Sequence, residues 1–148
     1  MDKKILFKHC ENMLMSVIEE YKHSISSYQL SSNNDTKSSM GDKYETTREM
    51  LQQEINSLQK QLSEMRMKLF NLRNIQFKAH YFQIELGALV VTTLGTFFIA
   101  VSIGKIIFEN QNLVLISMAS PLGKQLSGKK NGDFFILNNK EQQILNVI

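Results

Sequence analysis

The sequence has very little cysteine, and this excludes two classes of small protein. Cys10 is the only cysteine among 148 residues, so the chain can form neither an intrachain disulfide nor a cysteine-rich zinc site. This usage suits the reducing cytoplasm, which is the location we expect. The N-terminus also lacks the apolar core of a secretory signal, because charged residues follow Met1 within a few positions.

An excess of charge of one sign is also missing. The net charge is +3 and the isoelectric point is about 9.0. A protein whose main task is to hold phosphates carries more cations on one face, so direct nucleic-acid binding is only weakly indicated. Lys124, Lys129 and Lys130 make a local basic patch. That patch fits contact with an acidic protein surface or with nearby nucleic acid, and it fits a solvated turn equally well.

Only one long apolar run stands out. The run from Leu86 to Gly104 contains no charged residue, and a membrane-spanning helix needs about 20 apolar residues. Its apolar side chains are mostly β-branched or aromatic, which favours buried strands. Leu94 and Gly95 have the character of a turn between two such strands. We therefore expect a two-stranded unit here and no membrane partner.

Glycine and proline are missing from residues 3–30 and 43–78, and their absence favours two long helices. The small polar residues between these segments predict a loop at 31–43. Six of the seven glycines and the only proline lie from Gly87 onward, which indicates a β-rich second part. The fold class predicted from this division is α+β.

The second helix carries a heptad seam over four repeats, made by Tyr44, Thr47, Leu51, Ile55, Leu58, Leu62, Met65, Leu69 and Leu72. The first helix carries a compatible seam, interrupted once by Glu11 and made by Phe7, Leu14, Ile18, Tyr21, Ile25 and Tyr28. These seams predict an antiparallel coiled-coil hairpin over residues 1–78, with its tip loop at 31–43. Heptads alone leave open a second interpretation, in which the seam serves dimerisation or a scaffold.

Residues 79–148 are expected to form the β-rich domain. Ser120 and Pro121 predict the start of a short helix that Gly128 would end, and Asn131-Gly132-Asp133 predicts a turn. The expected strands are Leu89–Thr92, Phe97–Val101, Leu113–Ser117, Phe134–Leu137 and Gln142–Val147.

Two motifs carry a resemblance to a known family. Residues 116–133, ISMASPLGKQLSGKKNGD, resemble the C-terminal signature of the GreA/GreB transcription elongation factors, in which Ser-Pro, a small and apolar helical stretch, Gly-Lys, a spacer and Gly-Asp precede a closing strand. Tyr44, Arg48 and Glu49 resemble that family's opening of the second hairpin helix. The resemblance implies an FKBP-like fold for residues 79–148. It also implies docking or shape-determining roles for Ser120, Pro121, Gly128, Lys129, Gly132 and Asp133.

The resemblance further implies a partner. GreA/GreB proteins bind bacterial RNA polymerase, with the C-terminal domain at the rim of the secondary channel and the hairpin inside it. We therefore expect a polymerase-binding regulator that contacts nucleic acid only through the elongation complex. Such a chain is not itself an enzyme and binds no cofactor alone, and any Mg²⁺ would be shared with the active site of the polymerase. The oligomeric state is not indicated.

The hairpin tip departs from the family pattern. The family places an Asp seven residues before the tyrosine and a Glu four before it, where this chain has Lys37 and Met40. The nearby acids Asp35, Asp42 and Glu45 are the candidates for influence on the polymerase active site, with Asp35 and Asp42 as candidate Mg²⁺ ligands. Capping of the helix ends accounts for the same residues. Whether the tip promotes or inhibits transcript cleavage therefore stays open.

Other candidates are weaker. His9, His23 and His80 are widely spaced and form no recognisable metal site, and Cys10 has no evident catalytic partner, so packing is its expected role. A third function, prolyl isomerisation by an FKBP-like module, depends on fold alone, and fold does not fix function.

Overall fold

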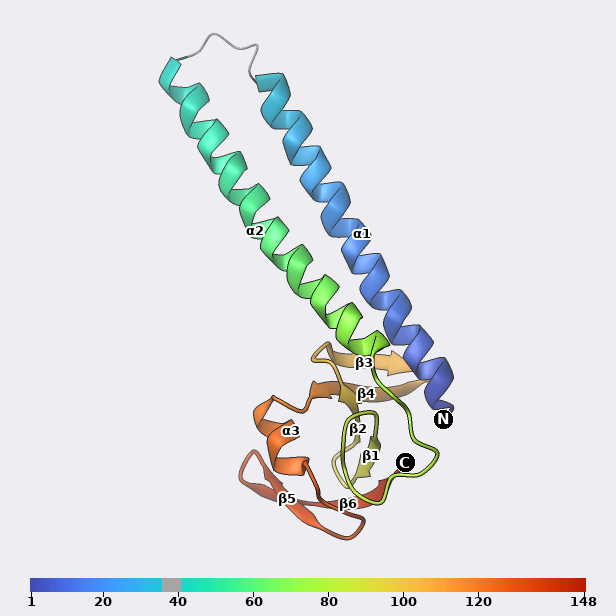
Figure 1. Ribbon diagram of the computed structural model, residues 1–148. Coiled ribbons are helices and arrows are strands. Elements are labelled where there is room, and N and C mark those ends of the chain that lie inside the picture. Colours follow the sequence, from blue (N-terminus) through green and yellow to red (C-terminus); the bar gives the residue numbers. More distant parts are fainter. Residues whose placement is uncertain (36–40) are drawn as a thin grey trace. The chain divides into compact units, whose positions relative to one another are not determined.

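The computed structural model describes residues 1–35 and 41–148 and divides into two compact units (Figure 1). Met1–His9 and Asn71–Ile148 form the first, called the sheet unit below, and Cys10–Phe70 forms the second, the hairpin unit. Two long helices are followed by a six-stranded mixed sheet, which confirms the α+β class. The predicted domains met after residue 78; the compact units divide after Phe70, and the first nine residues group with the C-terminal part.

The two long helices are α1, Lys3–Asp35, and α2, Gly41–Arg73. The predicted loop at 31–43 was too long, since both helices extend into it. Serine, asparagine and aspartate lower helix propensity by only about 0.5 kcal/mol each. Extending an existing helix adds one hydrogen bond per residue, so a few such residues do not end it.

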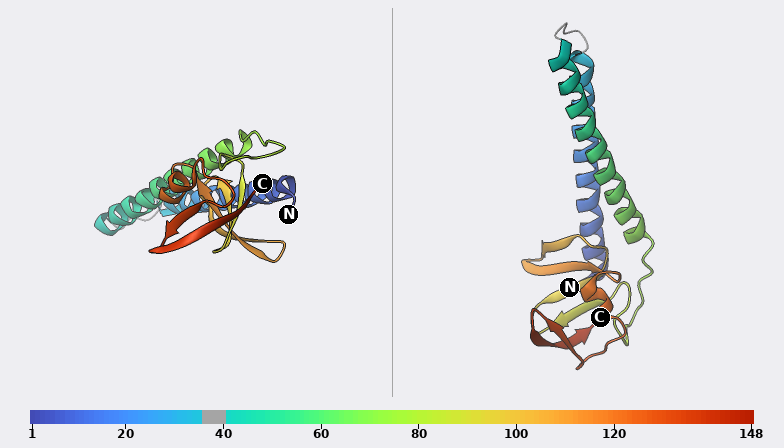
Figure 2. Two further views of the ribbon diagram at one scale, coloured as in Figure 1. Left: turned by 90° about the horizontal axis from the view of Figure 1, so that it is seen from below. Right: turned by 90° about the vertical axis from the view of Figure 1, so that its left-hand side faces the viewer.

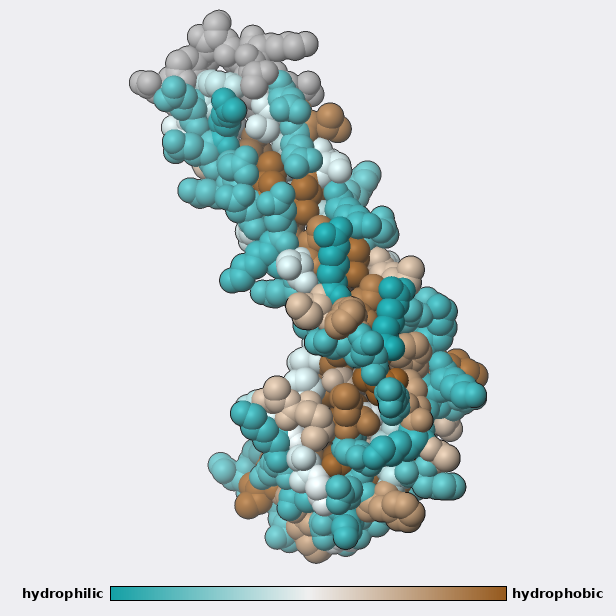
Figure 3. Space-filling view, in the orientation of Figure 1, coloured by the Kyte–Doolittle hydropathy of each residue, from teal (hydrophilic) through white to brown (hydrophobic). Residues whose placement is uncertain are grey.

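Most of the predicted heptad seam is buried within the hairpin unit, but Thr47 is exposed. Ile18 and Ile25 of α1 pack with Ile55, Leu58 and Leu62 of α2. Tyr21 Oη donates a hydrogen bond of 2.9 Å to Gln61 Oε1 across the two helices. The helices lie side by side in both orientations (Figure 2), and their shared seam is visible as a brown stripe between hydrophilic surfaces (Figure 3). The apolar side chains of the seam therefore pack against one another within one chain.

The sheet has the strand order β3-β4-β2-β1-β6-β5. Neighbouring strands β2 and β4 are parallel, and every other neighbouring pair is antiparallel. The strands are β1 Leu89–Thr92, β2 Thr96–Ala100, β3 Gly104–Phe108, β4 Gln111–Ser117, β5 Phe134–Leu137 and β6 Lys140–Val147. All five predicted strands are present with small shifts at their ends, and β3 was not predicted.

Two tight turns explain what sequence reasoning missed in the sheet. Glu109 and Asn110 have φ of 48° and 60° and join β3 to β4, while Asn138 and Asn139 have φ of 52° and 59° and join β5 to β6. Two successive positive φ angles make the turn that suits a two-residue hairpin. Its strongest signal is Asn-Gly, which neither turn contains. The buried Ile106 and Phe108, alternating with exposed neighbours, were the remaining sign of β3.

The apolar run from residue 86 to 104 supplies the centre of this sheet. Val90 and Phe97 pair across β1 and β2, and both are buried in the main core. Helix α3, Pro121–Leu126, packs over the same face with the buried Leu126; we call this the inner face. Among the described residues, no helix has the length and apolar content that a membrane crossing requires.

Aromatic contacts explain why the first nine residues belong to the sheet unit. The Phe7 ring meets Phe77 edge-on at 5.5 Å between centroids, and Phe77 stacks on Phe98 at 6.3 Å. Lys3 Nζ lies 4.2 Å from the Tyr81 ring centroid, and burial lowers the pKa of this ammonium group. Phe7 was predicted to lie in the hairpin seam. Its half-buried ring instead contacts the segment after α2, which is a correction.

The burial of Cys10 gives a prediction about pH. The side chain is fully buried, and burial raises the pKa of its thiol from 9.0 to about 11, because an apolar site disfavours the thiolate. Between these two values the unfolded chain has lost the proton that the folded chain keeps, so stability falls as pH rises from about 9 to 11. We expect urea unfolding to show this fall in the wild type and a smaller one in Cys10→Ala. Equal slopes would contradict it.

Candidate functional site

Ser120 and Pro121 start α3 as predicted. Gly123 N donates a hydrogen bond of 3.0 Å to Ser120 Oγ, and Ser120 Oγ donates one of 2.7 Å to the carbonyl oxygen of Ser117. Pro121 occupies the first helical turn, where its missing N–H costs nothing. The Ser-Pro pair therefore ties the end of β4 to the start of α3 and leaves the proline ring exposed.

Gly123 is a structural residue that sequence reasoning did not single out. A Cβ atom at this position would lie 2.0 Å from the carbonyl oxygen of Ser117, which is far inside van der Waals contact. Helix α3 can approach the end of β4 this closely only because residue 123 has no side chain. A glycine inside an expected helix was the available signal, since glycine is disfavoured there without a packing reason.

Gly128 and Lys129 connect the end of α3 to the segment before β1. Gly128 has a φ of 76°, which glycine adopts without strain. Its N–H donates to the carbonyl oxygen of Ile84 at 2.8 Å, and Ile84 N donates to that of Lys129 at 2.7 Å. Ile84 is buried, so this reciprocal pair fixes the exit of α3.

Gly132 and Asp133 form the predicted turn into β5. Gly132 N donates to the carbonyl oxygen of Ile144, and Ile144 N donates to that of Asp133, both at 2.8 Å. One carboxylate oxygen of Asp133 accepts a hydrogen bond of 2.8 Å from Lys130 N. The motif residues therefore share a role in fixing the backbone around α3, while a docking role for them stays a prediction.

Ser120 and Pro121 also line a shallow apolar depression that we call the α3–β5 groove. Its volume is about 530 Å³. Pro121 and Ile136 are exposed, the latter by 59% of its surface, so apolar surface is open to a partner. The lining residues are Ile116, Ser120, Pro121, Leu122, Gln125, Ile136 and Leu137.

The hairpin motif lies on the first turns of α2. Tyr44 is half-buried, and Glu45, Arg48 and Glu49 are exposed. The three charged side chains therefore lie on the surface, and the tyrosine lies partly within the hairpin.

The tip acids cannot be assigned a metal. The backbone of Asp35 ends α1 and that of Asp42 lies in the first turn of α2, but their side chains, like Lys37 and Met40, lie outside the described residues. Within the described part of the chain, no three His, Cys, Asp or Glu side chains gather as a metal would require. A role of Asp35 and Asp42 in holding Mg²⁺, which prefers several oxygen ligands, therefore stays a prediction.

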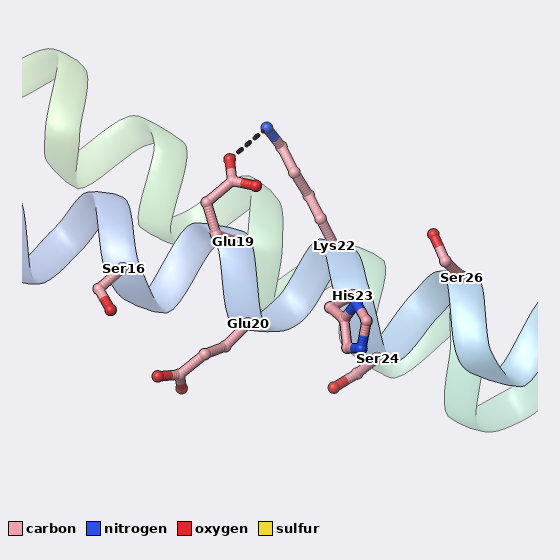
Figure 4. A pocket seen from close by; sticks show the side chains of 7 residues that line it. All are labelled: Ser16, Glu19, Glu20, Lys22, His23, Ser24 and Ser26. Carbon is pink, nitrogen blue, oxygen red and sulfur yellow. Dashed lines mark hydrogen bonds and ion pairs between the residues drawn. The ribbon is translucent and has the colours of Figure 1, made fainter.

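A second depression lies along α1 and carries acids, but it is not a site. Glu19 and Glu20 leave the helix on different sides (Figure 4), and Glu19 is held by Lys22 at 2.8 Å. All of its lining residues, Ser16 to Ser26, come from this one helix. A ligand would therefore be contacted from one side only.

In the predicted basic patch, Lys124 and Lys130 are exposed and Lys129 is half-buried.

Comparisons with known proteins give a likeness among solved structures alone. No protein-family model matches the chain, and no curated protein matches it. Among solved structures, that of the transcription factor Gfh1 is 18% identical to this chain, and the alignment covers 93% of this chain and 92% of that one with a TM-score of 0.36.

Proposed function

We propose that the chain binds bacterial RNA polymerase and regulates transcription elongation from the secondary channel. The observation that carries this proposal is the α3–β5 groove. Ser120 and Pro121 of the segment that resembles the GreA/GreB signature line this groove, and its exposed apolar members, Pro121 and Ile136, offer a surface to a partner. A motif resemblance and an accessible apolar surface thus coincide at one place.

The groove suits a protein partner better than a nucleic acid. Ser120 and Gln125 are its polar members, and none of the charged residues in ranges 1–35 and 41–148 lines it. Protein interfaces combine an apolar centre with a few hydrogen-bonding groups and contain few charges there, whereas contacts to phosphate need cations. The proposed partner surface therefore presents apolar side chains to Pro121 and Ile136.

The hairpin unit supports the second part of the proposal. Its apolar seam is buried between α1 and α2, and the acids and bases that open α2 are exposed. Two helices packed together make a narrow, polar-surfaced rod, since each helix is about 10–12 Å across with its side chains. Such a rod is suited to a narrow channel. Dimerisation through the heptad seam is less well supported, because the same side chains are already packed within the chain.

In this proposal the polymerase supplies the catalytic centre and the chain is not an enzyme. Because the polymerase acts on nucleic acid in the cytoplasm, this chain would act there too and would contact nucleic acid only within the elongation complex. Lys37 and Met40 stand where the family has acids, so we propose that the hairpin occupies the channel without efficient stimulation of cleavage.

Groove substitutions test the binding step. We expect Ile136→Asp to weaken binding to purified core polymerase by at least about tenfold, because a buried unpaired carboxylate costs more than 1.4 kcal/mol at an interface. Ile107→Asp is the matched control: Ile107 is also exposed, by 69%, and lies on the opposite edge strand of the same sheet. Equal binding of both variants, or no binding by the wild type, would remove the groove as the docking site.

Tip substitutions test the proposed lack of cleavage. We expect stalled polymerase to cleave its transcript at the same rate with the wild type, Asp35→Ala and Asp42→Ala, because no complete acidic pair is available at the family positions. The readout is the appearance of shortened transcripts over time, with binding checked for each variant. Faster cleavage with the wild type that either substitution abolishes would refute channel occupancy without cleavage.

A further inference from the structure

A pocket of about 620 Å³ opens on the inner face of the sheet unit, next to the α3–β5 groove. Leu122 and Leu137 line both depressions, so these two side chains stand between them. The floor contains Phe97 and Val114. Phe97 is held in place by an edge-on contact with Phe135 at 6.4 Å between ring centroids. The pocket therefore has a preformed apolar floor, and its volume falls in the range of small-molecule sites.

The register of three strands brings a single cation to this floor. Phe97 of β2 pairs with Val114 of β4, and Val114 pairs with Lys105 of β3. Residues directly opposite one another in a sheet project to the same face, so the three side chains form one row. Lys105 is exposed and, among the residues that the structure describes, is the only charged one that lines the pocket. In the described part of the chain, no carboxylate pairs with its ammonium group.

Neutral hydrogen-bonding groups complete the wall. Thr96 begins β2, Asn112 lies in β4, and Asn138 belongs to the tight turn between β5 and β6. The lining thus comes from the sheet, from α3 and from hairpin turns, so the pocket is bounded from several directions. One lysine balances one negative charge, whereas a phosphate group with two charges is usually held by several cations or backbone amides.

We propose that this pocket binds a small amphipathic carboxylate. The apolar body of the ligand lies over Phe97 and Val114, and its carboxylate meets the ammonium group of Lys105. The amides of Asn112 and Asn138 bind any further polar atom of the ligand. This site is separate from the polymerase-docking groove, and the proposal does not depend on polymerase binding.

Two probes of equal shape test the charge requirement. The full chain is titrated with 2-naphthylacetate and with its neutral analogue 2-naphthylacetamide while ¹⁵N–¹H NMR spectra are recorded. We expect saturable shifts at the backbone amides of Phe97, Lys105 and Val114 with the carboxylate, and about tenfold weaker binding of the neutral probe, since an ionised acceptor strengthens a hydrogen bond about twofold and adds ionic attraction. Shifts located elsewhere, or equal affinity for the two probes, would overturn the proposal.

Two lysine substitutions test whether Lys105 causes the preference for the carboxylate probe over the neutral probe. Lys105→Gln is expected to remove the preference for the carboxylate, so that both probes bind with the same weak affinity. Lys140→Gln is the matched control, because Lys140 is an exposed lysine of the same sheet that does not line the pocket. Retention of the preference in Lys105→Gln would overturn the assignment, and NMR spectra of both variants verify that the fold is unchanged.

Discussion

Gly123→Ala should destabilise the sheet unit by about 3 kcal/mol, toward the upper end of overpacking costs. The new methyl group would lie 2.0 Å from the carbonyl oxygen of Ser117. That oxygen belongs to the backbone of β4 and also accepts the hydrogen bond from Ser120 Oγ, so it cannot move without loss of the cap. Because α3 must shift, the groove is lost, and the proposed binding to the polymerase should weaken as well. Urea unfolding followed by circular dichroism measures the first effect.

Gly128→Ala is the appropriate control for this substitution. No heavy atom would lie within 4 Å of its added Cβ atom, and only the φ of 76° opposes a side chain. Such backbone strain costs about 1 kcal/mol. At position 123 a side chain is opposed by a steric clash, and at position 128 it is opposed only by the backbone conformation. We therefore expect Gly123→Ala to lose more stability than Gly128→Ala. Equal losses, or a fully stable Gly123→Ala variant, would show that α3 does not pack on β4 this closely.

Phe98→Ala should cost about 4 kcal/mol, as expected when a large aromatic side chain is removed from a core. Phe98 is fully buried in β2, and its ring stacks on Phe77, which in turn meets Phe7. Without the Phe98 ring, Phe77 loses its stacking partner, and the contact between Phe77 and Phe7 loses its support from the sheet. We therefore also expect faster amide hydrogen exchange at the start of α1 and in the segment around Phe77, in addition to a lower unfolding midpoint.

Phe134→Ala provides the comparison, because Phe134 lies in β5 of the same sheet and is 50% exposed. We expect it to cost less than about 1 kcal/mol, since surface substitutions change stability little. If the two variants lost equal stability, or if exchange at residues 1–9 did not respond to Phe98→Ala, the grouping of these residues with the sheet unit would be wrong.

The helices and most strands could be predicted because their signals are local. A seam such as Ile55, Leu58 and Leu62 reports directly which side of a helix is buried, and β-branched runs such as Val90-Val91 report a strand. The role of Phe7 could not be found in this way. Its heptad position is compatible with α2, but its partner Phe77 lies seventy positions away, and periodicity carries no information about such a contact.

The candidate site was predictable in part for the same reason. Ser120, Pro121 and Gly128 have local roles in starting and ending a helix, and the structure gives them those roles. Gly123 depends on how closely α3 approaches β4, and Lys105 depends on the register of a strand that was not predicted. Both are properties of strand and helix packing, so neither could be read from the neighbouring residues.

Photo-cross-linking from position 45 tests whether the hairpin enters the polymerase secondary channel. Glu45 is exposed near the start of α2, so a photoreactive amino acid can replace it without disturbing the seam. In a stalled elongation complex we expect a cross-link from this position to the interior of the polymerase secondary channel. Cross-links only between copies of this chain, with none to the polymerase, would contradict it and would favour a dimeric scaffold.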